Sequence, residues 1–161
     1  MRSCLTNRSA LGSAGRDDGF TLLEVMITVM LVGVLLAVGF PSYKAHRDKV
    51  LSRQAAQEIA QIGTIASNYW VDARAYPDSL AQIGMSGRLD PWGQPYVYYN
   101  VDANGRGGAR KDHATNPINT DFDLYSMGPD GQTQPQITQK SSVDDVIRAR
   151  NGAFVGTAAD Y

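Results

Sequence analysis

The sequence has few of the residues from which catalytic and metal centres are usually built. Its 161 residues include one cysteine, Cys4, and two histidines, His46 and His113, which lie far apart along the chain. A single cysteine excludes a disulfide within the chain, and zinc sites usually need several Cys or His ligands. No G-x-S-x-G or P-loop spacing occurs. We therefore expect a protein that is not an enzyme.

An excess of charge of either sign is also missing. The chain has 15 Lys and Arg residues against 16 Asp and Glu residues, which gives a formal net charge of -1 at pH 7. Nucleic-acid-binding domains usually carry a strongly basic field. We therefore expect no nucleic-acid partner.

One long apolar run stands out against this background. Residues 20–40 contain a single ionisable side chain, Glu24, and about 20 apolar residues are enough for a helix to cross a bilayer. No small-residue cleavage site of the secretory type follows at residues 38–41. The span is therefore expected to stay in the mature protein. The polar residues 1–19 in front of it have the composition of a leader.

A second helical pattern follows the apolar run. Apolar residues between 42 and 74 fall mostly three or four positions apart, with polar residues between them, which is typical of an amphipathic helix. Pro77 disfavours helix in the residue before it. The pattern predicts nearly continuous helix over residues 21–74, a length of about 80 Å at the usual rise per residue. Gly39 and Pro41 are expected to bend or loosen it.

The last part of the chain, residues 75–161, has strand character at two places. Residues 96–101 and 121–126 are rich in aromatic and β-branched side chains, and we expect them to pair antiparallel. Residues 102–120 are predicted to form a long surface loop. A polar C-terminal segment follows. The predicted fold class is α+β, with a long N-terminal helix packed on a small antiparallel sheet and a C-terminal loop region.

A short motif borders the apolar run on its N-terminal side. Gly19 precedes Phe20, Glu24 is the fifth residue counted from Phe20, and Pro41 ends the run. This arrangement resembles the signature of type IV prepilin-like proteins. The resemblance implies that a prepilin peptidase cleaves between Gly19 and Phe20 and methylates the new amine. It also implies that residues 20–41 form a membrane span that becomes the core of a filament.

Glu24 requires a partner, because a carboxylate at the centre of a membrane helix costs about 2.5 to 3.5 kcal/mol, although less near the helix end. In a filament, the partner would be the amine of Phe20 on a neighbouring subunit, in a charge-assisted bond that sets the axial register. The alternative is local. Thr21 and Glu24 have the spacing of a capping box, in which both side chains satisfy the N-terminus of the helix.

Two segments of the C-terminal half extend the resemblance to most of the chain. Residues 89–96, which include Asp90-Pro91-Trp92-Gly93, and residues 121–132 are similar to segments of the major pseudopilin of type II secretion. We expect Trp92 to pack on the long helix. The resemblance implies a type IV pilin-like fold.

The same resemblance implies a function and a location. The chain would be the structural subunit of a periplasmic pseudopilus that drives type II secretion across the outer membrane of a Gram-negative bacterium. It would be anchored in the inner membrane by a single span, with its C-terminal region in the periplasm. Its implied partners are further copies in a helical filament, the prepilin peptidase, minor pseudopilins and an inner-membrane assembly platform.

Two other functions fit the same residues. The first is a major or minor pilin of a type IV pilus, although the absence of cysteine from the mature chain favours a pseudopilin over many pilins. The second is a single-pass membrane adaptor with a calcium-binding ectodomain, which would keep residues 1–19.

The resemblance also implies a structural calcium site in the C-terminal loops. Calcium takes six to eight oxygen ligands with flexible geometry. Two departures from the family pattern bear on this site, since residues 133–141 are longer than the usual loop and residues 146–150 replace the customary ending. The implied ligands are the side chains of Asp130, Ser142, Asp144 and Asp145 and the carbonyl groups of Met127 and Gln132.

The residues of this site also have purely structural interpretations. Asp130 and Gly131 have the composition of a tight turn, and residues 142–145 have that of a helix N-cap with acidic residues in the first turn. Asp121 and Asp123 flank Phe122 in an alternating strand, and we expect them to face solvent.

Overall fold

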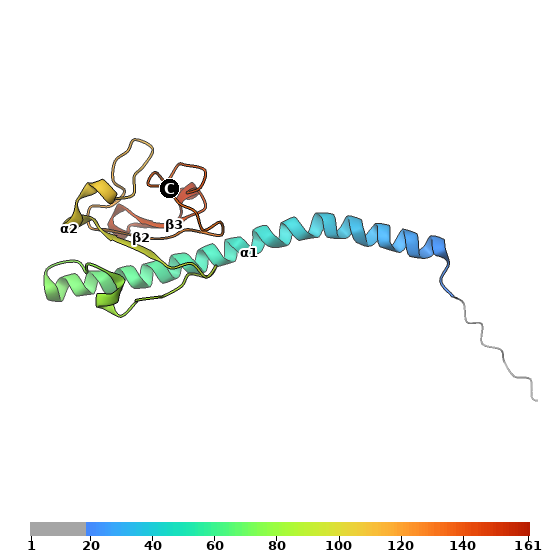
Figure 1. Ribbon diagram of the computed structural model, residues 1–161, viewed down its shortest axis with the longest axis horizontal. Helices are drawn as coiled ribbons and strands as arrows, with labels where there is room; N and C mark the ends of the chain where they lie inside the picture. Colours follow the sequence, from blue (N-terminus) through green and yellow to red (C-terminus); the bar gives the residue numbers. More distant parts are fainter. Residues whose placement is uncertain (1–18) are drawn as a thin grey trace, which may run out of the picture. The chain divides into compact units, whose positions relative to one another are not determined.

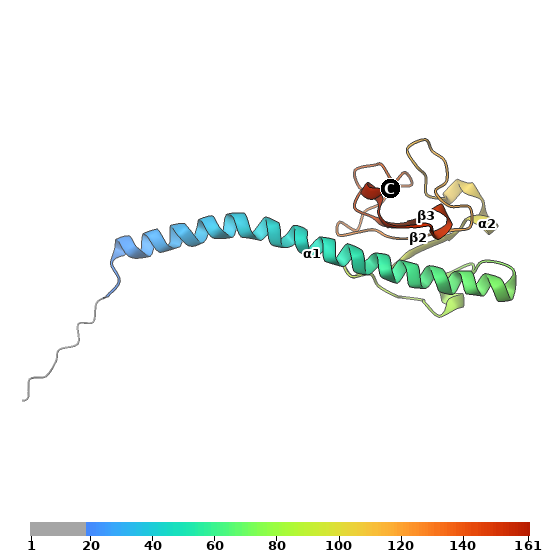
Figure 2. The ribbon, with the colours of Figure 1, turned by 180° about the vertical axis from the view of Figure 1, so that it is seen from behind.

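A computed structural model describes residues 19–161, so the predicted leader lies outside the described residues except for Gly19. The chain divides after Pro41 into two compact units. Figures 1 and 2 show the chain from opposite sides, coloured along the sequence from blue to red. The elements are α1 (Leu22–Ala73), η1 (Leu80–Ile83), β1 (Val97–Asn100), α2 (Val101–Asn104), η2 (Arg106–Gly108), β2 (Phe122–Ser126), β3 (Val146–Ala149), η3 (Arg150–Gly152), β4 (Phe154–Thr157) and η4 (Ala158–Asp160), where η denotes a 3-10 helix.

The helix α1 confirms the long helix predicted over residues 21–74. Its apolar N-terminal stretch is long enough to cross a membrane, and none of that stretch is buried within the protein. Large apolar side chains such as those of Leu22 and Leu35 are mostly exposed. The helix continues past Pro41, which lacks the N–H of a regular helical residue. The expected bend or loosening at this position stays a prediction.

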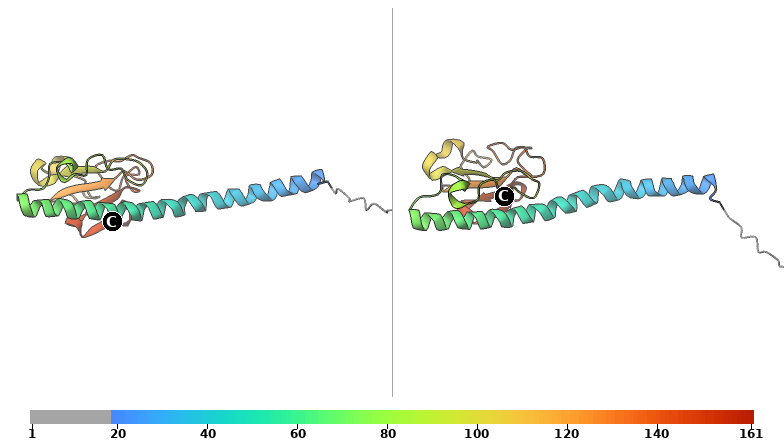
Figure 3. Two further views of the ribbon diagram at one scale, coloured as in Figure 1. Left: turned by 90° about the horizontal axis from the view of Figure 1, so that it is seen from below. Right: turned by 60° about the horizontal axis from the view of Figure 1, so that its bottom comes forward.

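The second unit contains a four-stranded antiparallel sheet with the strand order β1-β2-β3-β4. Figure 3 gives two further views of this unit. The predicted pairing of the first two strands is confirmed, with Tyr98 opposite Leu124. The strands β3 and β4 were not predicted. Both are only four residues long. All four side chains of β3 are buried, so it lacks the alternation by which a half-buried strand is found.

The core lies between the sheet and one face of the second half of α1. Small and β-branched residues three or four positions apart on the helix let the sheet approach closely. Fully burying a side chain the size of Ile or Phe contributes about 1.5 to 3 kcal/mol. Trp92 is partly buried against this cluster, which contains residues of both α1 and the sheet, so its expected contact with the helix itself stays a prediction. The cluster is formed by Ala55, Ile59, Ile62, Ala66, Tyr96, Phe122, Leu124 and Val146.

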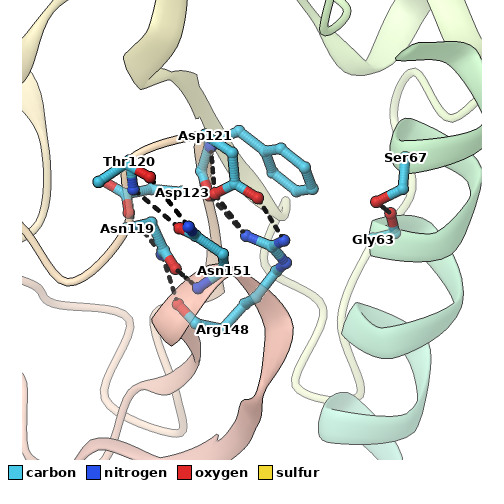
Figure 4. A network of polar contacts seen from close by, with 9 residues as sticks. Gly63, Ser67, Asn119, Thr120, Asp121, Asp123, Arg148 and Asn151 are labelled. Atoms are coloured by element: carbon cyan, nitrogen blue, oxygen red, sulfur yellow. Dashed lines mark hydrogen bonds and ion pairs between the residues drawn. The ribbon is translucent and has the colours of Figure 1, made fainter. Parts of the chain in front are cut away.

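A network of buried charges joins β2 to β3 (Figure 4). The guanidinium of Arg148 donates two hydrogen bonds to the carboxylate of Asp121, at 2.9 and 2.6 Å. The carboxylate of Asp123 accepts hydrogen bonds from the main-chain N–H of Arg110 and the side-chain amide of Asn119. The expectation that both aspartates face solvent is therefore wrong. The exposed fractions of Asp121 and Asp123 are 8% and 1%. Their partners come from β3 and from the loop that precedes β2.

The prediction of a surface loop over residues 102–120 is wrong in part. Much of the segment is exposed, but it contains α2 and η2, and Ala109, Arg110 and Ile118 are buried. Asn119 is also buried, and its side-chain oxygen accepts a hydrogen bond from the N–H of Asn151. Polar anchors thus hold the segment on the sheet, although its composition is that of a loop.

Replacing Arg148 tests how much the buried network contributes to stability. Arg148→Met leaves the carboxylate of Asp121 buried without its cation, so we expect the free energy of unfolding to fall by about 3 to 5 kcal/mol. Denaturant titration of the full-length chain in detergent, followed by tryptophan fluorescence, measures the change. Arg106→Met is the control, since this arginine is exposed and should change stability by no more than about 0.5 kcal/mol. Equal losses would contradict the role of the pair.

Candidate functional site

The predicted processing site lies on an exposed segment just in front of α1. Gly19 and Phe20 precede the first helical residue, and the side chain of Phe20 is 82% exposed. Apart from Gly19 itself and its two neighbours in the chain, no atom of the described residues lies within 4 Å of the position that a Cβ would take at Gly19. The peptide bond between the two residues is therefore outside the helix and open to solvent.

Thr21 caps the N-terminus of α1. Its hydroxyl accepts a hydrogen bond from the main-chain N–H of Glu24 at 3.2 Å. Its carbonyl accepts one from the N–H of Val25, also at 3.2 Å. This arrangement satisfies main-chain donors that otherwise have no partner in the first turn of a helix. Half of the predicted capping box is thus confirmed.

The other half of the capping box is absent. Within residues 19–161, the carboxylate of Glu24 has no hydrogen-bond or ion-pair partner. The main chain of Glu24 is bonded, through its N–H to the hydroxyl of Thr21 and through its carbonyl to the hydroxyl of Thr28 at 2.7 Å. The local interpretation therefore explains Thr21 but not Glu24. An unpaired carboxylate at the start of an apolar helix is available to a cation from outside the chain.

Pro41 lies apart from the other residues of the N-terminal motif. It follows Glu24 by 17 residues along α1, which corresponds to about 25 Å of helix. Phe20 lies just in front of the helix and Glu24 lies in its first turn, whereas Pro41 lies far along the helix from both. The roles of all three in processing and assembly stay predictions.

Two of the predicted calcium ligands lie next to each other in the C-terminal loops. Partial burial and the nearby carboxylate of Asp130 raise the pKa of Asp144, and the main-chain N–H of Asp130 offsets part of this rise. Gly128 packs directly on the main chain of Asp144, since a Cβ at Gly128 would lie 2.5 Å from the Asp144 carbonyl oxygen. Two adjacent like charges favour a cation between them.

The backbone conformation tests the two structural interpretations of this region, a tight turn at Asp130 and Gly131 and a helix N-cap at residues 142–145. The side chain of Asp130 accepts a hydrogen bond from the N–H of Gln132 at 2.8 Å, and Gly131 has a φ of 66°. A tight turn at Asp130 and Gly131 is therefore confirmed. Residues 142–144 lie in turns and Asp145 lies just before β3, so no helix begins here and the N-cap interpretation is wrong.

The other two side chains of the predicted calcium set bind neighbours within the protein. The hydroxyl of Ser142 accepts a hydrogen bond from the main-chain N–H of Gln134 at 2.7 Å. The carboxylate of Asp145 accepts hydrogen bonds from Arg110 and Thr133, both at 2.6 Å. Burial raises the pKa of Asp145 while these hydrogen bonds and the Arg110 charge oppose the rise. Its second oxygen is buried and has no hydrogen-bond partner in the described part of the chain.

Arg110 and Thr133 take part in this site but were missed by the sequence analysis. The guanidinium of Arg110 bonds both Asp145 and the hydroxyl of Thr133, and it lies over the ring of Tyr125. Arg110 comes from a segment rich in glycine and polar residues, where nothing in the sequence distinguishes a buried arginine from an exposed one. Only a covariation between Arg110 and Asp145 among homologues would have pointed to the pair.

The donor set fits a calcium ion only in part. Among the residues that the structure describes, no three Asp, Glu, His or Cys side chains converge as a metal-binding group. Asp130 and Asp144 supply two carboxylates, and calcium would need about four more oxygens from main-chain carbonyls and water. A depression of about 390 Å³ is lined by Asp130, Gln132 and the basic Lys140, and Asp144 is not among its lining residues. The six-residue calcium set stays a prediction.

Comparison with known proteins confirms the resemblance seen in the sequence. The family model of the prokaryotic N-terminal methylation motif matches residues 15–40. This range includes the predicted cleavage site, Glu24 and the apolar stretch of α1. No solved structure matches the chain.

Similar curated proteins cover most of the chain. Type II secretion system core protein G of Escherichia coli strain K12 is 29% identical over 146 residues, which are 76% of this chain and 90% of the relative. The protein of the same name from Pectobacterium carotovorum subsp. carotovorum is 26% identical over 153 residues, or 81% of this chain and 87% of the relative. That of Pseudomonas aeruginosa strain PAO1 is 28% identical over 138 residues, or 73% and 87%.

Proposed function

Because residues 15–40 match the prokaryotic N-terminal methylation motif and most of the chain is similar to type II secretion system core protein G, we propose that it is a structural subunit of a pseudopilus. The observation that carries the proposal is the carboxylate of Glu24, which has no partner among residues 19–161, close in sequence to an exposed Gly19–Phe20 bond. Cleavage at that bond creates an amine four residues from Glu24. The proposed role is polymerisation rather than catalysis.

The proposed assembly rests on the apolar stretch of α1. In the membrane its side chains face lipid, and in a filament they face neighbouring helices. Lipid tails are as apolar as these side chains, so the hydrophobic effect does not by itself favour association. The charge-assisted bond from the amine of Phe20 on one subunit to Glu24 on the next would supply specificity and set the register. Extraction from the membrane would require work from an inner-membrane assembly platform.

The proposed location follows from the same helix. A single span in the inner membrane would place the second unit in the periplasm. The prepilin peptidase would remove the leader before assembly, and minor pseudopilins would join the filament. A type IV pilus would use the same helix, so these steps are common to both kinds of filament.

The first test is the chemical state of the N-terminus. We expect intact mass and N-terminal sequencing of the protein, isolated from membranes of its own host, to show a chain that begins at N-methylated Phe20. A chain that still begins at Met1 would contradict the filament proposal and support a membrane adaptor that keeps residues 1–19.

The second test removes the charge of Glu24. We expect Glu24→Ala and Glu24→Gln to insert into the membrane as the unchanged chain does, because each removes a carboxylate from the apolar segment. Filament yield, measured by shearing and sedimentation, should fall about tenfold or more, since unpairing one member of a buried charge pair costs about 3 to 5 kcal/mol.

The matched control for this test is Asp72→Asn. Asp72 is an exposed acid on the same helix but outside its apolar stretch, so its loss should leave filament yield unchanged. Unchanged yield with Glu24→Gln would exclude a charge-assisted bond, and unchanged yield with both Glu24 variants would remove this residue from the mechanism.

We also propose that the C-terminal loops bind one calcium ion with a structural role. The adjacent carboxylates of Asp130 and Asp144 support this proposal, with the carbonyl oxygens of Met127 and Gln132 as further donors. The ion would offset the repulsion between the two carboxylates and join two loops that have little apolar surface. The contacts of Ser142 and Asp145 would then hold these loops in place from the inside.

Thermal unfolding of the full-length chain in detergent tests the calcium proposal. We expect added calcium to raise Tm relative to EDTA, because a ligand at 100 times its Kd adds about 2.7 kcal/mol of stability. The double variant Asp130→Asn, Asp144→Asn should lose the shift, and the control Asp102→Asn, at an exposed aspartate of α2, should keep it. No shift in the unchanged chain, or an equal shift in the double variant, would overturn the calcium site and leave the filament proposal untouched.

A further inference from the structure

The segment of α1 that follows the apolar stretch carries a dense group of basic side chains. We call Lys44, Arg47, Lys49 and Arg53 the basic collar, and all four are exposed. Only Arg47 forms an ion pair among the residues that the structure describes, with Asp48 at 3.4 Å. The collar therefore presents mostly unpaired positive charge.

The collar differs in charge from the rest of the second unit. Residues 42–53 contain four Lys and Arg residues and one acidic residue, whereas residues 54–161 contain eight Lys and Arg residues and twelve acidic residues. The near-neutral charge of the whole chain hides this asymmetry. A local positive field on an otherwise acidic unit attracts a negatively charged partner specifically to this part of α1.

The positions of the four side chains show what kind of partner fits. At 3.6 residues per turn, Lys44 and Arg47 lie on one side of the helix, and Lys49 and Arg53 lie on the opposite side. A protein partner that docks on one face would meet only half of these charges. A layer of anions that surrounds the helix would meet all of them.

Tyr43 gives an independent sign of the same environment. It directly precedes the collar, and its side chain is 69% exposed. Tyrosine is enriched where membrane helices pass through the interface between hydrocarbon and water, with its ring among the lipid headgroups. Lys and Arg side chains near the ends of such helices extend their charged groups to the same level.

From these observations, we propose that the basic collar binds the phosphate groups of anionic phospholipids. These lipids would belong to the membrane leaflet on the same side as the second unit. Each Lys or Arg near an anionic lipid surface adds to the attraction, which falls off within the Debye length. The interaction adds lipid selectivity to the anchoring by the apolar stretch, and it does not require a filament or a calcium ion.

Energy transfer from the protein to labelled lipids measures this selectivity in the full-length chain. In a Cys4→Ser background, Ala45→Cys carries a donor dye, and the chain is reconstituted in phosphatidylcholine vesicles. Trace phosphatidylglycerol or phosphatidylcholine, labelled on the acyl chain, serves as acceptor. At low salt, we expect energy transfer from the donor to labelled phosphatidylglycerol to exceed transfer to labelled phosphatidylcholine by about threefold or more. High salt should reduce this difference, because it screens the charges.

A charge-neutral variant and a matched control complete the experiment. Replacing the collar with glutamine (Lys44→Gln, Arg47→Gln, Lys49→Gln, Arg53→Gln) should remove the preference, while carbonate extraction shows that the chain is still inserted. Replacing Arg74, Arg106, Lys140 and Arg150 with glutamine removes the same number of charges from other exposed positions and should leave the preference intact.

Two results would overturn the proposal. The first is equal transfer to both lipids in the unchanged chain, or a preference that survives the loss of the collar. The second is energy transfer between donor-labelled and acceptor-labelled copies of the chain, in vesicles where no lipid preference is seen. This transfer would have to disappear when the collar is replaced. That result would assign the collar to contact with a second copy.

Discussion

A segment that crosses a membrane must satisfy every main-chain hydrogen-bonding group internally, and this requirement shapes the protein from its N-terminus onward. The helix α1 meets it, with Thr21 supplying a side-chain acceptor in the first turn. The second half of the same helix serves a different purpose, since Ile59 and Ile62 face the sheet. One regular element thus presents an apolar surface on all sides and then an apolar surface on one side only.

The second unit depends on buried charges as much as on its apolar core. Arg148 links β3 to Asp121, which lies just before β2, and Arg110 links its own loop to Asp145. Both guanidinium groups also lie over aromatic rings, of Phe122 and Tyr125. Buried ion pairs add little net stability when both partners are present, but they penalise any arrangement that separates the charges. They therefore specify how the irregular C-terminal segments lie on the sheet.

Charged side chains around the sheet and charged side chains in the first part of α1 differ in whether they have partners. The buried aspartates of the second unit have partners within the chain, such as Arg148 and Asn119. The carboxylate of Glu24 and most of the basic collar have none among residues 19–161. Satisfied groups stabilise a subunit that folds alone, whereas unsatisfied groups on a regular helix are available for contacts with other molecules.

The sequence by itself determined the helix, the processing motif and the pairing of β1 with β2, because these depend on local periodicity and on residues that are close in the chain. It did not determine β3, β4 or the burial of Asp121 and Asp123. Those features depend on Arg148 and Arg110, which reach their partners across 27 and 35 residues of sequence. A buried arginine and an exposed one look alike in a sequence, and only the tertiary structure decides which carboxylate each one neutralises.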